Sequence, residues 1–315
     1  MRHICAEDVA VVHEARQMTR EGPEHTEDKL AKIGVQAMML KGSFAELGAF
    51  ETLRKVSAIG YNAVEISQIP MTPENVAELD RSRDELGMDI AALSVATETP
   101  KGVPGDSLKD HFEKIVDDAK RLDAHLLRIG MMPFPAMKSI DAVVEFAKQA
   151  NEYAERLQEQ GLGLYYHNHH IEFAKFGGKY VLDIIAENSP AMGMEIDVHW
   201  VQRGGLDPVR TLAKYAGRTA MVHLKDYRIG ELPEPAFGLL ETGDVMGFMA
   251  EFKNVVQFAE VGEGNLDFPS IIPAAQAAGA EYLLVEQDEL YGRTVWEALQ
   301  TSYDNLVAMG HADLF

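Results

Sequence analysis

The stretch IDAVVEFAKQANEYAERLQEQGLGLYYH (residues 140–167) decides the fold. Its first part places apolar residues at helical spacing and ends in a glycine, which predicts a helix over 140–161 with a glycine C-cap. The run that follows, LGLYYH (162–167), has the length and composition of a buried strand. A helix leading directly into a buried strand is the unit from which parallel α/β sheets are built.

The same alternation runs through most of the chain. Further helical patterns cover 48–60, 73–87 and 108–123, and the predicted strands are VQAMML (35–40), NAVEIS (62–67), DIAALSVA (89–96), HLLRIG (125–130), LGLYYH (162–167), MGMEID (192–197), AMVHLK (220–225) and YLLVEQ (282–287). Eight strands with interleaved helices predict an α/β protein with a closed, parallel (β/α)8 TIM barrel. A doubly wound open sheet is the alternative.

Two segments fall outside this repeat. Residues 1–32 are charged and aperiodic, so we expect an N-terminal arm, followed by the barrel domain at 33–315. The segment from Tyr227 to about Phe258 is longer than most connections, which run about 2–6 residues. Long connections after barrel strands often cover active sites, and we expect this one to do the same.

Composition limits the classes of function. The 315 residues include one cysteine, Cys5, so an internal disulfide and a cysteine zinc site are both excluded. The 50 acidic and 29 basic residues give a net charge of -21, which repels nucleic acid and anionic lipid. No apolar run approaches the roughly 20 residues of a membrane span, and the N-terminus lacks a signal-peptide core, so we expect a cytoplasmic protein without a membrane partner.

Four predicted strands end in side chains that bind metals. These residues are His167, Asp197, His223 and Glu286. The carboxyl ends of parallel barrel strands meet at one face, so we expect the four groups to converge. Burying two carboxylates together is unfavourable unless a cation neutralises them. Mixed nitrogen and oxygen donors suit Mn²⁺, Zn²⁺, Co²⁺ or Fe²⁺, and suit Mg²⁺ less well.

Each of these residues also has a structural interpretation. Glu286 could be the polar start of a loop, and Asp197 could be a helix N-cap, although VHWVQRGG after it does not read as helical. Alternation along an extended chain would point His167 and His169 inward and Asn168 away. Glu260 and Glu263, in a glycine-bearing loop, give a weak signal for phosphate or sugar contact.

Taken together, several motifs resemble a known family. HNHHIEF, MEIDVHWVQRGGLDP, MVHLKD, EVGEGNLDF and LLVEQDE are similar to the sugar phosphate isomerase/epimerase family, xylose isomerase-like TIM barrels that include ketose 3-epimerases, inosose dehydratases and endonuclease IV-type proteins. The resemblance covers residues 33–315. It implies one divalent metal, with Mn²⁺ favoured, held by Asp197, His223 and Glu286 on strands six to eight. The strand-five ligand, a glutamate in the epimerases, is His167 here.

The resemblance implies a metal-dependent isomerase or epimerase that forms an enediolate from a keto-sugar or related polyol. The candidate catalytic residues are Glu286, His169, Glu172 and Lys225. Because His167 replaces one of the two glutamates of the epimerase mechanism, a lyase or dehydratase of a keto-inositol or 3-keto-sugar is the alternative. An endonuclease IV-like hydrolase and a non-catalytic sugar-binding barrel are further alternatives. Barrels of this kind commonly pair, which implies a homo-oligomer.

Overall fold

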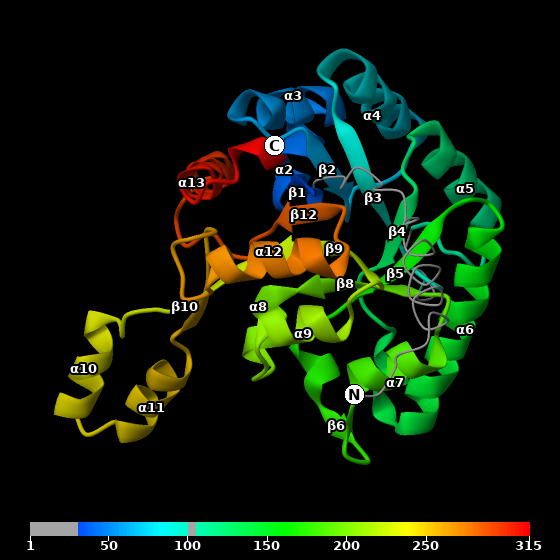
Figure 1. Ribbon diagram of the computed structural model, residues 1–315. Coiled ribbons are helices and arrows are strands. Elements are labelled where there is room, and N and C mark those ends of the chain that lie inside the picture. Colours follow the sequence, from blue (N-terminus) through cyan, green and yellow to red (C-terminus); the bar gives the residue numbers. More distant parts are fainter. Residues whose placement is uncertain (1–30, 100–104) are drawn as a thin grey trace, which may run out of the picture. The chain divides into compact units, whose positions relative to one another are not determined.

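The computed structural model describes residues 31–99 and 105–315. Eight parallel strands close into a barrel in the spatial order β1-β12-β9-β8-β5-β4-β3-β2 (Figure 1). These strands are β1 (Lys32–Gln36), β2 (Ala63–Ile66), β3 (Asp89–Val95), β4 (Leu126–Ile129), β5 (Gly163–His167), β8 (Gly193–Asp197), β9 (Thr219–Leu224) and β12 (Tyr282–Val285). The predicted (β/α)8 TIM barrel is confirmed, and the open sheet is excluded.

Helices surround the barrel on its outer side (Figure 1). They are α2 (Lys41–Leu47), α3 (Ala49–Ile59), α4 (Pro73–Leu86), α5 (Phe112–Arg121), α6 (Ile140–Gln158), α7 (Val181–Asn188), α8 (Val198–Arg203), α9 (Pro208–Lys214), α12 (Phe268–Ala278) and α13 (Val295–Ala308). Short 3₁₀ helices are η1 (Ala37–Leu40), η2 (Phe134–Lys138), η3 (His170–Phe173) and η4 (Ala312–Leu314).

Local signals set the helix ends. The Thr72 side chain accepts a hydrogen bond from the Asn75 N–H at the start of α4, and Gly87 ends that helix in the left-handed conformation. At the start of α6, the Ser139 side chain accepts a hydrogen bond from the Ala142 N–H. The predicted helices at 48–60, 73–87 and 140–161 therefore agree with α3, α4 and α6 to within three residues at each end, and α5 is shorter than the predicted 108–123.

The first strand differs from its prediction. The sequence predicts a strand over 35–40, whereas β1 ends at Gln36 and residues 37–40 form η1. The Gln36 side-chain oxygen accepts a hydrogen bond from the Met38 N–H, which turns the chain and ends the strand. An apolar run cannot distinguish a buried strand from a buried turn of helix. The predicted arm at 1–32 lies outside the described residues, except for its last two, and Lys32 already belongs to β1.

The long connection after β9 forms a separate projection. Strands β10 (Asp226–Ile229) and β11 (Val256–Ala259) pair antiparallel, and helices α10 (Glu234–Glu241) and α11 (Val245–Lys253) follow between them. Figure 1 shows the two helices standing out from the barrel at the lower left. A second small hairpin joins β6 (Lys175–Phe176) to β7 (Lys179–Tyr180).

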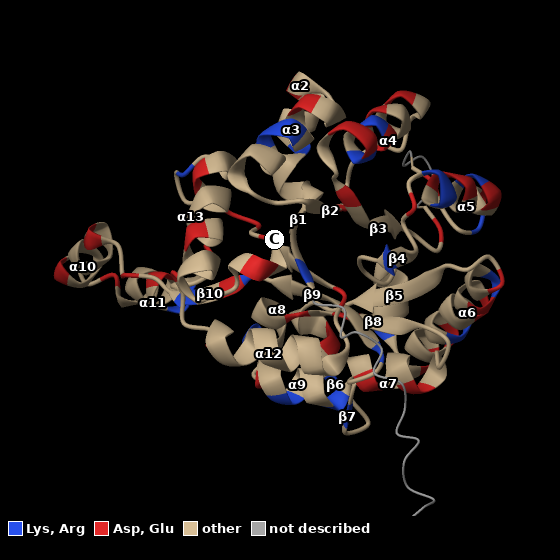
Figure 2. Ribbon diagram, turned by 45° about the horizontal axis from the view of Figure 1, so that its top comes forward, with Lys and Arg blue, Asp and Glu red and all other residues tan. Residues whose placement is uncertain are grey.

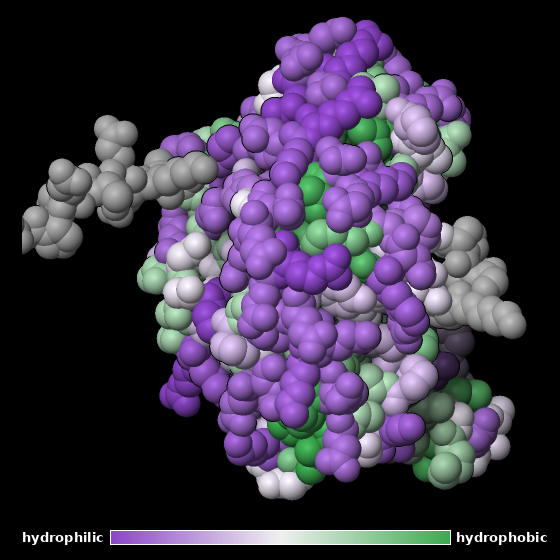
Figure 3. Space-filling view, turned by 90° about the vertical axis from the view of Figure 1, so that its right-hand side faces the viewer, coloured by the Kyte–Doolittle hydropathy of each residue, from purple (hydrophilic) through white to green (hydrophobic). Residues whose placement is uncertain are grey.

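The core lies between the barrel and its helices, where apolar side chains from both are buried. Charged residues cover the outer faces of α3, α4 and α5 (Figure 2). The side that carries α5 and α6 is mostly hydrophilic, with hydrophobic residues only in small separate groups (Figure 3). Among the described residues, no helix combines the length and the apolar character needed to cross a membrane.

Candidate metal centre and substrate cavity

The structure brings together the four residues predicted as metal ligands. His167 and Asp197 are the last residues of β5 and β8, His223 is in β9, and Glu286 directly follows β12. All four are buried, and one nitrogen or oxygen atom of each lies within 4.8 Å of the corresponding atoms of the others. We call this group the four-residue cluster.

Distances within the four-residue cluster match a shared cation. His223 Nδ1 lies 3.1 Å from His167 Nε2 and 2.6 Å from Glu286 Oε2. Asp197 Oδ2 lies 3.5 Å from His167 Nε2 and 3.8 Å from His223 Nδ1. Atoms that bind one ion at about 2.0–2.2 Å stand roughly 3–4 Å apart. The donor atoms therefore need little movement to share a cation.

Hydrogen bonds orient both imidazoles toward the cluster. His223 Nε2 lies 2.9 Å from Glu65 Oε2, and His167 Nδ1 lies 3.3 Å from the Gly130 carbonyl oxygen. Each oxygen is an acceptor, so these ring nitrogens carry the hydrogens and the opposite nitrogens face the centre. Metal-binding histidines are held in this way in known sites.

The centre of the cluster requires positive charge. Asp197 Oδ2 is buried and accepts no hydrogen bond, and it lies 3.5 Å from His167 Nε2, 3.8 Å from His223 Nδ1 and 3.5 Å from Lys225 Nζ. Burial by itself lowers the pKa of His223, but Glu195, Glu286 and Glu65 outweigh it and hold that pKa well above its usual value. Lys225 Nζ, 3.1 Å from Glu286 Oε2, supplies part of this charge, and a proton on His223 or a bound cation would supply the rest. The donor set fits a divalent metal.

Asp197 also caps a helix, which corrects the sequence analysis. Its Oδ1 accepts a hydrogen bond of 2.9 Å from the Trp200 N–H, and α8 begins at the next residue. Asp197 Oδ1 therefore caps the helix, and Oδ2 points toward the four-residue cluster. Asn168 does not face away, because its side-chain oxygen accepts a hydrogen bond of 3.1 Å from the Asp197 N–H. The helix was not apparent in the sequence because α8 has only six residues.

Lys225 is a buried cation next to the four-residue cluster. Its Nζ lies 2.8 Å from Asp288 Oδ1, 3.1 Å from Glu286 Oε2 and 3.5 Å from Asp197 Oδ2. Burial favours the neutral amine, but Glu286, Asp197 and Asp288 outweigh it and raise the pKa of Lys225 above its ordinary value. Lys225 is therefore charged at neutral pH, and in that form it cannot accept a proton.

The other two catalytic candidates, His169 and Glu172, occupy different places. Burial and the neighbouring His167 lower the pKa of His169 to about 2, and its buried Nδ1 makes no hydrogen bond. Glu172 has both oxygens occupied, one by the Tyr166 hydroxyl at 2.8 Å and one by the His169 N–H at 2.7 Å. His169 lines the cavity described below and Glu172 does not. Glu172 thus holds the backbone of His169 and does not line the cavity.

Three charged residues that the sequence analysis missed lie inside the barrel beside His223. Arg128 Nε lies 2.5 Å from Glu65 Oε1 and 3.2 Å from Glu195 Oε2, and Glu195 Oε1 lies 3.2 Å from His223 Nε2. We call Glu65, Arg128 and Glu195 the inner network. Glu65 and Arg128 are the charged residues of the otherwise apolar strands β2 (AVEI) and β4 (LLRI), and Glu195 lies between two apolar residues of β8 (GMEID). A charge between apolar strand residues is a signal that could have identified them.

The charges of the inner network depend on one another. Burial raises the pKa of Glu65, but Arg128 and His223 outweigh it and lower that pKa to about 2. Burial and the nearby Glu65 carboxylate raise the pKa of Glu195 to about 7. One guanidinium therefore holds two carboxyl groups of unequal acidity beneath the four-residue cluster.

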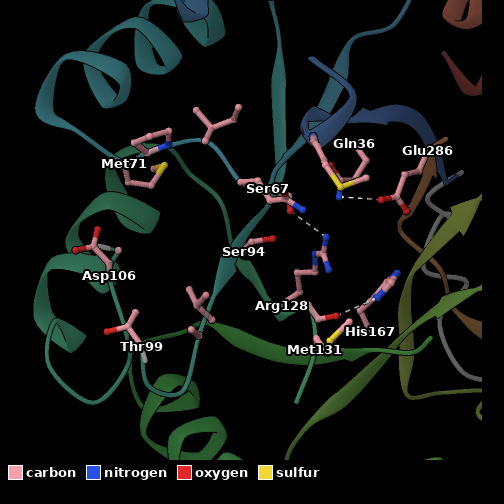
Figure 4. A pocket seen from close by; sticks show the side chains of 18 of the residues that line it. Gln36, Ser67, Met71, Ser94, Thr99, Asp106, Arg128, Met131, His167 and Glu286 are labelled. Carbon is pink, nitrogen blue, oxygen red and sulfur yellow. Dashed lines mark hydrogen bonds between the residues drawn. The ribbon is translucent and has the colours of Figure 1, made fainter. Parts of the chain in front are cut away.

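A cavity of about 870 Å³ adjoins the four-residue cluster. In Figure 4, Gln36, Arg128, His167 and Glu286 lie at one end, Met71, Asp106 and Thr99 lie at the other, and Ser67 and Ser94 lie between them. None of the residues of the 227–258 connection lines this cavity, although the Phe258 ring lies 5.4 Å from Lys225 Nζ. The expectation that the connection covers the site stays a prediction.

The glycine-bearing loop gives no anion site. The backbone N–H groups of Gly262, Gly264 and Leu266 donate to the Asp226 carboxylate at 2.9–3.2 Å. A Cβ on Gly264 would come within 2.3 Å of Asp226 Oδ1, so only glycine fits there. Glu260 pairs with Arg293 at 3.1 Å. These groups stabilise the loop and are not available to a phosphate.

This fold and this site define a class of protein. Residues 53–300 match the family described as "Xylose isomerase-like TIM barrel", and the chain belongs to that family. The resemblance seen in the sequence is thus confirmed.

Sequence identity to the individual proteins compared with this chain is low. The rhizopine catabolism protein MocC of Rhizobium meliloti is 28% identical over 170 residues, which make up 53% of this chain and about half the length of that relative. A sugar phosphate isomerase/epimerase of Parabacteroides distasonis has a TM-score of 0.65 at 21% identity, covering 88% of this chain and 98% of its own. The D-allulose 3-epimerase of Methylomonas sp. has a TM-score of 0.60 at 16% identity, covering 90% and 98%. The two structures share the fold.

Proposed function

We propose that this protein is a divalent-metal-dependent enzyme that removes a proton from the carbon next to the carbonyl of a keto-sugar or related polyol. Return of that proton to the other face or to the neighbouring carbon makes it an epimerase or isomerase. One observation carries the proposal: two imidazoles and two carboxylates converge on one buried point, with their outer hydrogen bonds fixed, beside a large cavity.

His167, Asp197, His223 and Glu286 would hold the metal. Their two nitrogen and two oxygen donors suit Mn²⁺, Zn²⁺, Co²⁺ or Fe²⁺ and suit Mg²⁺ less well. The family resemblance favours Mn²⁺ among these. The metal supplies positive charge that polarises the carbonyl and stabilises the negative charge formed when the proton leaves.

Three residues that line the cavity would perform the proton transfer. Glu286 serves as the base, because Lys225 and His223 outweigh its burial and hold its pKa well below the usual value, so it is ionised. Lys225, with its fixed charge, stabilises the enediolate oxygen. His169 is neutral and has a free Nδ1, so it can hold or pass on a hydroxyl proton.

A lyase or dehydratase is the second candidate, and one observation favours it. His167 stands where the epimerases carry a glutamate, and Glu172 has both oxygens occupied outside the cavity. The other carboxylates that line the cavity, Asp288 and Asp106, are paired with Lys225 at 2.8 Å and with Lys114 at 2.7 Å, so neither matches the second glutamate of the epimerases. Expulsion of a β-hydroxyl from the same enediolate would give dehydration.

Solvent exchange tests the shared first step. The protein, dialysed against chelator and reloaded with Mn²⁺, is incubated in D₂O with a panel of keto-sugars and keto-inositols. Deuterium should appear by NMR at the carbon next to the carbonyl, in an epimer, an isomer or a dehydrated product. The product distinguishes isomerase from lyase. Absence of exchange with every substrate, while the protein binds stoichiometric Mn²⁺, would refute the proposal.

The acidic charge disfavours the remaining alternatives. Endonuclease IV-like hydrolysis needs a groove that attracts DNA, and the net charge of -21 repels it. A non-catalytic sugar-binding barrel has no need for a centre that demands a cation. We propose a small-molecule sugar or polyol as the substrate, with a cytoplasmic homo-oligomer as the working form.

A further inference from the structure

Gln36 and Glu286 lie side by side where the barrel closes. The first strand, β1, pairs in parallel with the last, β12, and Val35 lies opposite Val285. The residues that follow these two are Gln36 and Glu286, and both are buried and line the cavity (Figure 4). Gln36 Nε2 donates a hydrogen bond of 3.2 Å to Glu286 Oε1, across 250 positions of sequence. Closure of the barrel therefore creates a polar pair beside the four-residue cluster.

The Gln36 amide has one orientation that satisfies both of its neighbours. Its oxygen accepts a hydrogen bond from the Met38 N–H, so its nitrogen faces Glu286. A flipped amide would set an N–H against the Met38 N–H and an oxygen against the carboxylate. The turn after β1 therefore fixes the direction of the hydrogen bond that Glu286 accepts.

Ending the first strand does not by itself require glutamine. Asparagine, aspartate and serine are shorter, and each supplies the side-chain oxygen that caps the first turn of a helix. The additional length of Gln36 carries an amide nitrogen to Glu286 on the neighbouring strand. Only 1% of Gln36 is exposed, so both hydrogen bonds are made away from water. The contact with Glu286 is thus the part of this side chain that the turn does not explain.

The two oxygens of Glu286 have different neighbours. Oε2 lies 2.6 Å from His223 Nδ1 of the four-residue cluster and 3.1 Å from Lys225 Nζ. Oε1 accepts a hydrogen bond from Gln36 alone among the residues that the structure describes. A carboxylate oxygen has two lone pairs, so Oε1 keeps one that can take a proton.

We infer that Gln36 is a positioning residue, which holds Glu286 Oε1 apart from the four-residue cluster as the atom that accepts the substrate proton. The inference rests on the proposed function, in which Glu286 is the base. The bond between the substrate carbon and its hydrogen breaks, and the proton forms a bond to Oε1, which makes Glu286 a neutral acid. The electron pair left on carbon moves toward the carbonyl oxygen and forms the enediolate. Oε2 stays with His223, so one side chain serves both as base and as ligand.

Two substitutions separate this role from the turn. Gln36→Asn keeps an amide oxygen that can cap the Met38 N–H, but it is one CH₂ group too short to reach Glu286. Gln36→Met keeps the length and loses both hydrogen bonds. Both variants should slow deuterium exchange in D₂O about 100-fold, because a reacting group displaced by about 1 Å loses that much rate. Gln158→Met is the matched control and should keep the wild-type rate, since the Gln158 amide bonds the Ala191 carbonyl oxygen outside the cavity.

Two further measurements do not depend on turnover. Crystal structures of both Gln36 variants without metal should show Glu286 Oε1 displaced by about 1 Å, with Oε2 still within hydrogen-bond range of His223 Nδ1. Mn²⁺ affinity, measured by calorimetry, should stay within about threefold of wild type, because Oε2 keeps its neighbours. Loss of a residue that orients a ligand atom costs about 10- to 100-fold instead.

The outcomes distinguish this inference from the proposed function. Exchange at the wild-type rate in Gln36→Asn, with slow exchange in Gln36→Met, would make Gln36 a turn residue and overturn the inference, as would wild-type exchange in both. An unmoved Glu286 carboxylate in the two variant structures, or Mn²⁺ binding weakened about tenfold or more, overturns it as well. If the wild-type protein exchanges no substrate, the proposed function fails, and the variant structures still decide whether Gln36 holds Oε1 in place.

Discussion

Two groups of buried charges lie next to each other in this barrel, and their charges are balanced in different ways. The inner network places a guanidinium between two carboxylates, so its counter-charge comes from the chain itself. The four-residue cluster directs two imidazole nitrogens and two carboxylates at one point, with Lys225 only at its edge. His223 belongs to both, through Nε2 on one side and Nδ1 on the other. In the inner network a cation of the chain lies between the carboxylates, whereas in the four-residue cluster the donor atoms gather around one point, where we propose that a metal ion binds.

Replacing the inner cation should have the largest effect. In Arg128→Leu, Glu65 and Glu195 lose their buried counter-charge, and the free energy of unfolding should fall by about 3–5 kcal/mol. Urea denaturation followed by circular dichroism measures this. Arg54→Leu, which removes a surface pair with Glu51, should leave stability nearly unchanged. Similar small losses in both variants would show that the inner network does not depend on Arg128.

Removing a ligand from the four-residue cluster should act on the metal and not on the fold. His167→Ala should weaken Mn²⁺ binding by about 100- to 1,000-fold, because a cation loses one of four donors fixed in place. Calorimetric titration of the apo protein measures it, with His311→Ala as the matched control outside the cavity. Retention of wild-type affinity in His167→Ala would remove this residue from the ligand set.

Binding of Mn²⁺ should raise the stability of the folded protein through the four-residue cluster. At a free Mn²⁺ concentration of about 100 times Kd, the wild-type protein should gain about 2.7 kcal/mol of stability, because only the folded state presents the site. His167→Ala should gain far less at the same concentration. Equal stabilisation of both proteins would mean that Mn²⁺ binds elsewhere.

The junction between the two groups can be tested at Glu65. Glu65→Gln keeps the size but removes the charge that accepts the His223 Nε2 hydrogen, so Mn²⁺ affinity should fall by about 10-fold or more. Equilibrium dialysis with metal analysis measures this. Unchanged affinity would show that the inner network supports the barrel without orienting His223.

The smallest effect is expected outside both groups. Tyr166→Phe removes the hydroxyl that bonds Glu172 at 2.8 Å and the Met132 N–H at 3.2 Å, which should cost about 1–2 kcal/mol of stability. Mn²⁺ affinity should stay within twofold, because Glu172 only fixes the backbone of His169. A large loss of metal affinity would bring Glu172 back as a functional residue.

Much of the architecture was predictable because its signals are local. Apolar runs of strand length, helical periodicity and glycine caps mark β5, α4 and α6 within the chain itself. The prediction of the first strand over 35–40 was wrong, because the turn after Gln36 depends on a side-chain hydrogen bond that the hydrophobic pattern does not show. The helix that Asp197 caps was too short to show a period.

The candidate site, too, was predictable only in part. The order of residues placed His167, Asp197, His223 and Glu286 at the carboxyl ends of parallel strands, where a closed barrel gathers them. Closure also decided what order alone does not: Arg128 of β4 reaches Glu65 of β2, whereas Glu172, close to His167 in sequence, turns away to Tyr166. The sequence determines which functional side chains each strand carries, because strands and helices can be recognised from local patterns of residues. Which side chains meet depends on the stagger of strands around the cylinder, a long-range property that only the assembled barrel has.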